Sequence, residues 1–102
     1  MEAELKTYLV DLKSLRREVK GENHERIAKK PIRDCAEQLA SKWFNVIVKN
    51  AAEHYAFPPE VIEGYSGHCK RLIKLTENNN LRKSYLDILD NLIRHFGTCQ
   101  EF

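Results

Sequence analysis

Apolar residues recur at intervals of three and four along four segments of this chain, and this period constrains the fold more than any other feature. In residues 2–20 the stripe is Leu5, Tyr8, Leu9, Leu12, Leu15 and Val19. Such a spacing places side chains on one face of an α-helix. Gly21 follows, with Arg17 and Lys20 in the last turn, and both features are typical of a helix C-terminus. The segment predicts an amphipathic helix over 2–20.

A longer pattern over 31–56 carries two apolar rows. The first row is Ile32, Cys35, Ala36, Leu39, Ala40, Trp43, Val46 and Ile47. The second row is Phe44, Val48, Ala52 and Tyr55. Pro31 suits the first turn of a helix, and Pro58 ends the pattern because the residue before a proline avoids the α region. Two rows predict a helix with neighbours on more than one side, so we expect this second helix to be central in the fold.

The third segment, 59–76, allows two interpretations. Its stripe is Val61, Ile62, Tyr65, Cys69, Leu72 and Ile73. Gly64 and Gly67 would each destabilise a continuous helix by about 1 kcal/mol. The alternative is a break over 64–67 followed by a helix that Ser66 caps. We favour one continuous helix.

The fourth segment begins after a turn of three asparagines at 78–80, a composition typical of turns and helix N-caps. Its stripe is Leu81, Tyr85, Ile88, Leu89, Leu92 and Phe96. Gly97 predicts the end of this helix, with Arg94 and His95 in its last turn. The fourth helix is therefore expected over 80–96.

These segments predict an all-α fold, a compact bundle of about four helices that are mostly antiparallel, with the second helix central. A chain of 102 residues corresponds to a single domain over 1–102. No apolar run approaches the roughly 18 residues that cross a bilayer. The N-terminus is acidic and unlike a signal peptide, and three cysteines form no disulfide pattern. We therefore expect a reducing, cytoplasmic location.

Charge is concentrated in one part of the sequence. Residues 13–33 contain eight basic and three acidic residues, a net charge of +5 in a chain of +2. Such segregation indicates a surface for phosphates or another acidic partner. The alternative is a solvated helix–helix corner, and no aromatic residue interleaves to stack on bases. The candidate binding residues are Arg16, Arg17, Lys20, Arg26, Lys29, Lys30 and Arg33.

Metal and catalytic patterns are weak. The four histidines form no Glu-x-x-His or His-x-x-x-His pair, and no Cys-x-x-Cys occurs, so we expect no metal site. Cys35 lies on an apolar stripe, where burial makes a thiol inert, and Cys69 has only its neighbour His68 as a base. No glycine-rich loop lies between a strand and a helix. We expect no cofactor and no small-molecule substrate.

One pair of residues resembles a known family motif. Arg17 and His24 are separated by six residues, and the HEPN superfamily, which comprises small helical bundles that include many ribonucleases, shares an Arg-x(4–6)-His motif. The resemblance covers these two positions alone. It implies an Arg17 that holds a phosphate and a His24 that transfers protons. The match straddles a helix end near the N-terminus, whereas the family usually has it late in the chain on a helix.

The sequence therefore favours a small non-enzymatic binding or assembly module that acts through protein–protein contacts, including self-association as a dimer. A nucleic-acid-binding adaptor that uses the 13–33 region is the alternative. A HEPN-like ribonuclease is a third hypothesis.

Overall fold

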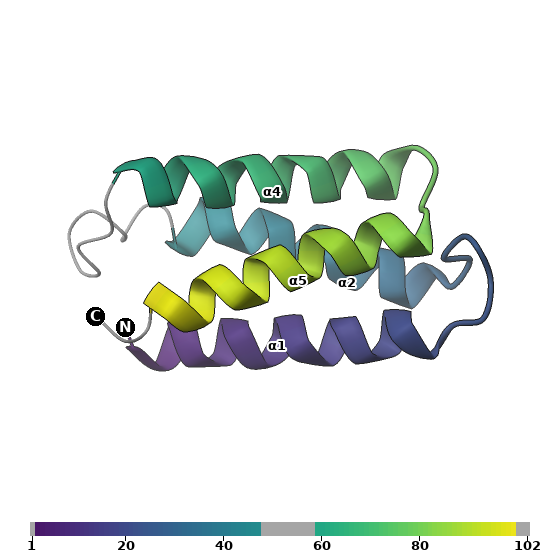
Figure 1. Ribbon diagram of the computed structural model, residues 1–102, viewed down its shortest axis with the longest axis horizontal. Coiled ribbons are helices and arrows are strands. Elements are labelled where there is room, and N and C mark those ends of the chain that lie inside the picture. The colour runs from purple at the N-terminus through teal and green to yellow at the C-terminus, as the bar shows by residue number, and fades with distance from the viewer. Residues whose placement is uncertain (1, 48–58, 100–102) are drawn as a thin grey trace.

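The apolar stripes become packed helices in the computed structural model, which describes residues 2–47 and 59–99. The elements in chain order are α1 (Glu2–Gly21), α2 (Lys30–Lys42), the π-helical segment η1 (Trp43–Ile47), α4 (Pro59–Glu77) and α5 (Arg82–Cys99). The α-helices alternate in direction, and α1 and α4 each lie beside both α2 and α5 (Figure 1). The predicted all-α, mostly antiparallel bundle is confirmed.

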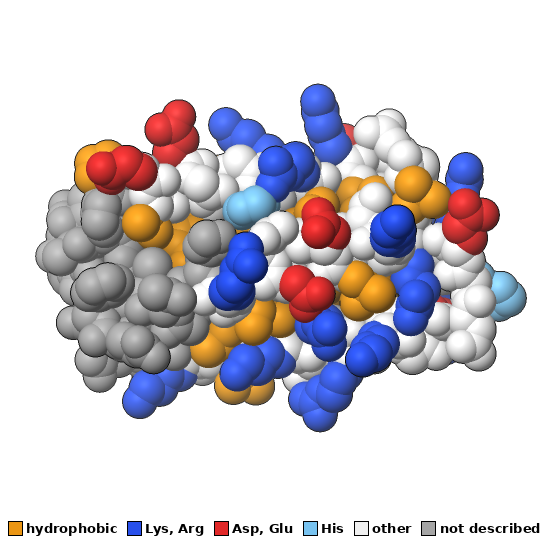
Figure 2. Space-filling model, in the orientation of Figure 1, with side chains coloured by type: hydrophobic (Ala, Val, Ile, Leu, Met, Phe, Trp, Pro, Cys, Tyr) orange, Lys and Arg blue, Asp and Glu red, His pale blue; other side chains and the backbone are white. Residues whose placement is uncertain are grey.

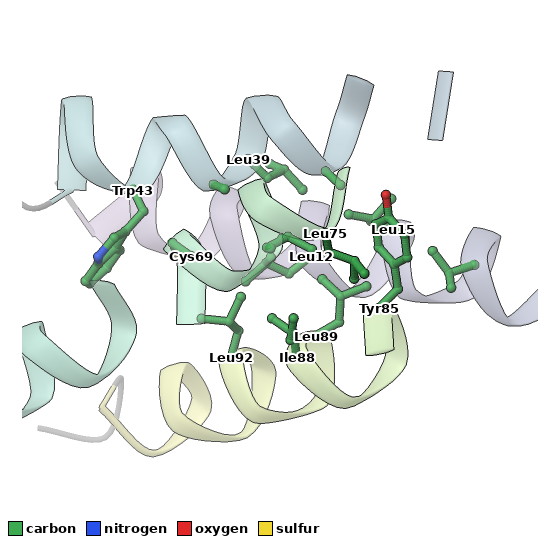
Figure 3. Close-up of a cluster of buried hydrophobic side chains, with 14 of the residues drawn as sticks. Leu12, Leu15, Leu39, Trp43, Cys69, Leu75, Tyr85, Ile88, Leu89 and Leu92 are labelled. Atoms are coloured by element: carbon green, nitrogen blue, oxygen red, sulfur yellow. The ribbon is translucent and has the colours of Figure 1, made fainter. Parts of the chain in front are cut away.

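Most of the core consists of residues that the stripes predicted. Figure 3 shows side chains from all four α-helices meeting in one cluster, with Leu12 of α1, Leu39 of α2, Leu75 of α4 and Leu89 of α5 among them. The second helix packs against α1 and α4, as its two apolar rows predicted, although every helix of this bundle has two neighbours. Two core residues lie outside the predicted stripes: Ile27, which lies in the polar connection yet is 2% exposed, and Leu75 of α4, which is 8% exposed.

The helix ends differ from the sequence predictions in specific ways. Helix α4 runs unbroken through Gly64 and Gly67, so the favoured continuous helix is confirmed. Helix α5 continues through Gly97 to Cys99, and the predicted end at residue 96 is wrong. Glycine permits a helix to end but does not oblige it to, because it weakens a helix by only about 1 kcal/mol. The second helix becomes π-helical at 43–47, and the remainder of its predicted range lies outside the described residues.

Two connections distant in the sequence are joined at one end of the bundle. The backbone N–H of Ile27 donates to the carbonyl of Asn80 at 2.8 Å, and that of Arg82 donates to the carbonyl of Glu25 at 2.8 Å. The Arg82 guanidinium also donates to the carbonyls of Val19 at 3.1 Å and Lys20 at 2.7 Å. The last carbonyls of α1 are thus satisfied by a side chain from α5.

The turn before α5 depends on an asparagine. Asn80 has a φ of 53°, in the left-handed region that asparagine tolerates better than most residues. Its side-chain oxygen accepts a 2.6 Å hydrogen bond from the hydroxyl of Tyr85. This bond ties the turn to the first turns of α5. Because the φ of Asn80 is not helical, α5 begins after this residue, at Arg82, rather than at residue 80.

Candidate functional site

The joined connections bring a second basic segment beside the first. Residues 70–83 contain five basic residues, Lys70, Arg71, Lys74, Arg82 and Lys83, against the single acid Glu77. With the +5 of residues 13–33, the two segments carry +9, and the rest of the chain carries −7. We call the part of the bundle that these two segments form the basic half. Figure 2 shows Lys and Arg side chains prevailing over acidic ones on its visible face.

Residues 70–83 were not among the predicted binding residues, because their cations are divided between two helices on either side of an uncharged turn. The sequence did contain a signal for this segment, which is its net charge of +4 over 14 residues. Nothing in the sequence indicated, however, that the segment would fold beside residues 13–33.

Five of the seven predicted binding residues are exposed, and four of these five form no ion pair with any described residue. Arg17 and Lys20 lie on the outer surface of α1, Arg26 lies in the connection, and Lys30 is the first residue of α2. Exposed cations without an acidic partner remain available to an anionic ligand.

The other three predicted residues have partners or are partly buried. Arg16 forms an ion pair with Asp90 of α5, and Lys29 pairs with Glu22 at 3.3 Å. Arg33 is half-buried, and its Nε forms no hydrogen bond with any described residue. Burial raises the pKa of Tyr85 to about 12, and the Arg33 charge opposes this rise. Surface ion pairs such as Lys29–Glu22 contribute only about 0–1 kcal/mol, so a polyanion can compete for them.

The second segment adds four exposed cations, Lys70, Arg71, Lys74 and Lys83. None of them forms a salt bridge within the described part of the chain. The guanidinium of Arg71 contacts Nδ1 of His68 one turn earlier on α4. Arg82 differs from these four because both of its hydrogen bonds hold the end of α1.

Two adjoining shallow hollows follow the seam between α4 and α5. One is lined by Arg71, Lys74, Leu75, Asn78, Asn79, Ser84 and Ile88. The other is lined by Arg71, Lys83, Ser84, Asp87 and Ile88. They share Arg71, Ser84 and Ile88, and we call them together the seam hollow. It is open to solvent and carries three cations and one carboxylate.

A third hollow lies on the outer surface of α2 and has a different character. Its lining residues are Asp34, Glu37, Gln38, Ser41, Lys42 and Asn45. Two carboxylates and one ammonium group give it a net negative charge. It therefore offers no site for an anion.

The described thiols are not activated for catalysis. Burial raises the pKa of the Cys69 thiol to about 12, against a smaller opposing effect of its hydrogen bond with Tyr8. Burial also raises the pKa of Cys35, and the nearby carboxylates of Glu18 and Asp11 raise it further. A reactive cysteine needs the opposite shift. Within residues 2–47 and 59–99, no group of three His, Cys, Asp or Glu side chains could hold a metal ion.

The two residues of the HEPN-like pair are both exposed. Arg17 lies on α1 and His24 in the following connection, and neither lines one of the three hollows. No hydrogen bond joins them in the described part of the structure. Phosphate holding and proton transfer require both groups to act on one phosphodiester, and the two side chains share none of these three hollows.

Little apolar surface is exposed on the described residues. Val10 is their only exposed large hydrophobic residue, at 59%. The rings of Tyr8, Trp43, Tyr65 and Tyr85 are buried. This surface has no exposed aromatic platform of the kind that binds unstacked bases.

Comparisons with protein-family models, curated proteins and solved structures give no match to this chain. No helix in the described ranges is long and apolar enough to cross a membrane. The basic half and the seam hollow are therefore the features of the described residues that bear on function.

Proposed function

We propose that this chain is a small non-enzymatic binding module that holds the phosphate backbone of a nucleic-acid duplex on its basic half. One observation carries the proposal. Two basic segments far apart in the sequence fold side by side and present nine exposed cations that form no salt bridge with any described residue. These are Lys13, Arg17, Lys20, Arg26, Lys30, Lys70, Arg71, Lys74 and Lys83.

Electrostatics favours a polyanion over an apolar partner. Lysine and arginine bind backbone phosphates and release condensed counterions, and this contribution does not depend on base sequence. The described aromatic rings are buried or, for Phe44, half-buried, so base stacking does not contribute to the proposed contact. A duplex, which presents its phosphates outward, is the nucleic acid that suits such a surface.

A protein partner is the second candidate function, and Val10 supports it. This valine is 59% exposed on α1, and exposed large hydrophobics are common at protein interfaces. A specific protein interface buries about 800 Å² on each partner, far more than one valine supplies. The charge distribution therefore makes the duplex the better-supported partner.

The predicted cytoplasmic location is part of the same proposal, because a reducing compartment keeps the thiols of Cys35 and Cys69 free.

A charge-reversal experiment tests the proposed function. The binding of a fluorescently labelled 20-base-pair DNA duplex is measured by anisotropy for the wild type and for the double variant Arg26→Glu with Lys30→Glu. The matched control, Lys6→Glu with Lys42→Glu, changes the net charge equally but lies outside the basic half. We expect the first variant to lose at least ten times more affinity than the control. Equal losses would show that only net charge matters.

A further inference from the structure

The seam hollow takes its cations from two helices that are held in a fixed relation. Arg71 and Lys74 come from α4, and Lys83 comes from the first turn of α5. The turn between them is closed by a hydrogen bond from the Asn80 N–H to the Leu75 carbonyl at 3.0 Å. A rigid frame reduces the entropy lost when several side chains converge on one ligand.

The polar groups of the hollow are mainly hydrogen-bond donors. Arg71 offers a planar fork, Lys74 and Lys83 offer ammonium groups, and Ser84 offers a hydroxyl. Asp87 is its only carboxylate, so the net charge is +2. A ligand with several acceptor oxygens and a negative charge is complementary to such a lining, and an uncharged ligand is not.

The apolar residues of the hollow give no reason to expect a hydrophobic ligand. Leu75 is 8% exposed and Ile88 is 7% exposed, because both belong to the core. They form an apolar base and offer no polar group to a ligand. The lining thus combines an apolar base with a cationic rim.

We propose that the seam hollow is a phosphate subsite, in which Arg71, Lys74, Lys83 and Ser84 hold one backbone phosphate of the bound duplex. This inference rests on the proposed function and deepens it. Arg71 and Ser84 line both parts of the hollow, so they occupy its centre and contact the phosphate oxygens. The subsite fixes the position of the duplex on the basic half and carries no base specificity.

The first test uses inorganic phosphate and backbone amide NMR spectra. Titration with sodium phosphate should shift the amide signals of Asn79, Lys83 and Ser84, relative to sodium chloride at the same ionic strength. In Arg71→Gln and Lys83→Gln these shifts should decrease at least threefold. The control Arg17→Gln removes an exposed cation outside the hollow and should leave them unchanged. Shifts that are equal across all exposed lysines would overturn the subsite.

The second test uses the 20-base-pair duplex, and circular dichroism verifies that each variant remains folded. Arg71→Gln should weaken duplex binding about five- to tenfold and reduce the salt slope by about 1. The subsite is refuted, and the proposed function survives, if this variant binds as the wild type does while Arg26→Glu with Lys30→Glu fails. Conversely, phosphate shifts in the hollow without any duplex binding would refute the proposed function and retain the anion site.

Discussion

Substitution of Arg82 by alanine should destabilise the protein because this side chain, together with two backbone hydrogen bonds, joins the two basic segments. Its guanidinium donates two hydrogen bonds to the last carbonyls of α1, at 3.1 Å to Val19 and 2.7 Å to Lys20. Alanine would remove both bonds. The Lys20 carbonyl would then be capped only by water, whereas the Val19 carbonyl would keep its 3.1 Å hydrogen bond from the Glu22 N–H.

The expected loss follows from the character of these bonds. A hydrogen bond to a charged group contributes about 1.5–3 kcal/mol, and exposure lowers this figure. The Nε bond to Val19 is partly buried, whereas the second bond is exposed. We therefore expect the free energy of unfolding to fall by about 2 kcal/mol. For a chain of 102 residues, an unfolding entropy of about 2.1 cal/mol/K per residue converts this loss into about 9 °C of Tm.

Urea unfolding and a thermal melt of Arg82→Ala measure the effect, with Lys83→Ala as the matched control. Lys83 is the next residue, is exposed and forms no salt bridge with the described residues. Its substitution should change the free energy of unfolding by less than about 0.5 kcal/mol. Equal stabilities of the two variants would refute the assigned role of Arg82 at the end of α1.

Three further predictions concern the core and the turn. Trp43→Phe should lower the free energy of unfolding by about 1–2 kcal/mol in urea, because it loses the 3.2 Å bond to Ser66 and leaves a gap beside Tyr65; an unchanged midpoint would contradict this packing. Asn80→Ala should cost more than Asn80→Gly in a thermal melt, by about 1 kcal/mol, because only glycine adopts a positive φ freely; the reverse order would contradict the turn geometry. Stability should decrease above about pH 9 by up to about 1.4 kcal/mol per pH unit, because the Cys69 thiol ionises in the unfolded chain but has a pKa of about 12 when folded. Urea unfolding of Cys69→Ala between pH 8 and pH 10 should show a smaller decrease, and an identical one would exclude this thiol as the cause.

The sequence predicted the helices well because their cause is local. Apolar side chains at intervals of three and four, such as Leu12 and Leu15, can be buried only if the segment is helical. Ile27 was missed because its burial depends on a connection folding against a distant turn. The end of α1 shows the same limit, since Arg82 caps it from 62 positions away.

The candidate site was predicted in part. The exposure of Arg17, Lys20, Arg26 and Lys30 follows from their position outside the apolar stripes. The pairing of Arg16 with Asp90 could not be read from the sequence, because it spans 74 positions. The contribution of residues 70–83 depends on the packing of α4 against α5. No local sequence pattern predicts this packing.

The salt dependence of duplex binding tests the central claim most directly. If about four of the nine exposed cations contact phosphates together, log Kd should change with log salt at a slope of about 3.6, because each contact contributes about 0.9. The affinity of the wild type for the 20-base-pair DNA duplex should then fall roughly 150-fold between 50 and 200 mM salt. No binding at 50 mM, or an affinity that salt does not change, would contradict the role assigned to the basic half.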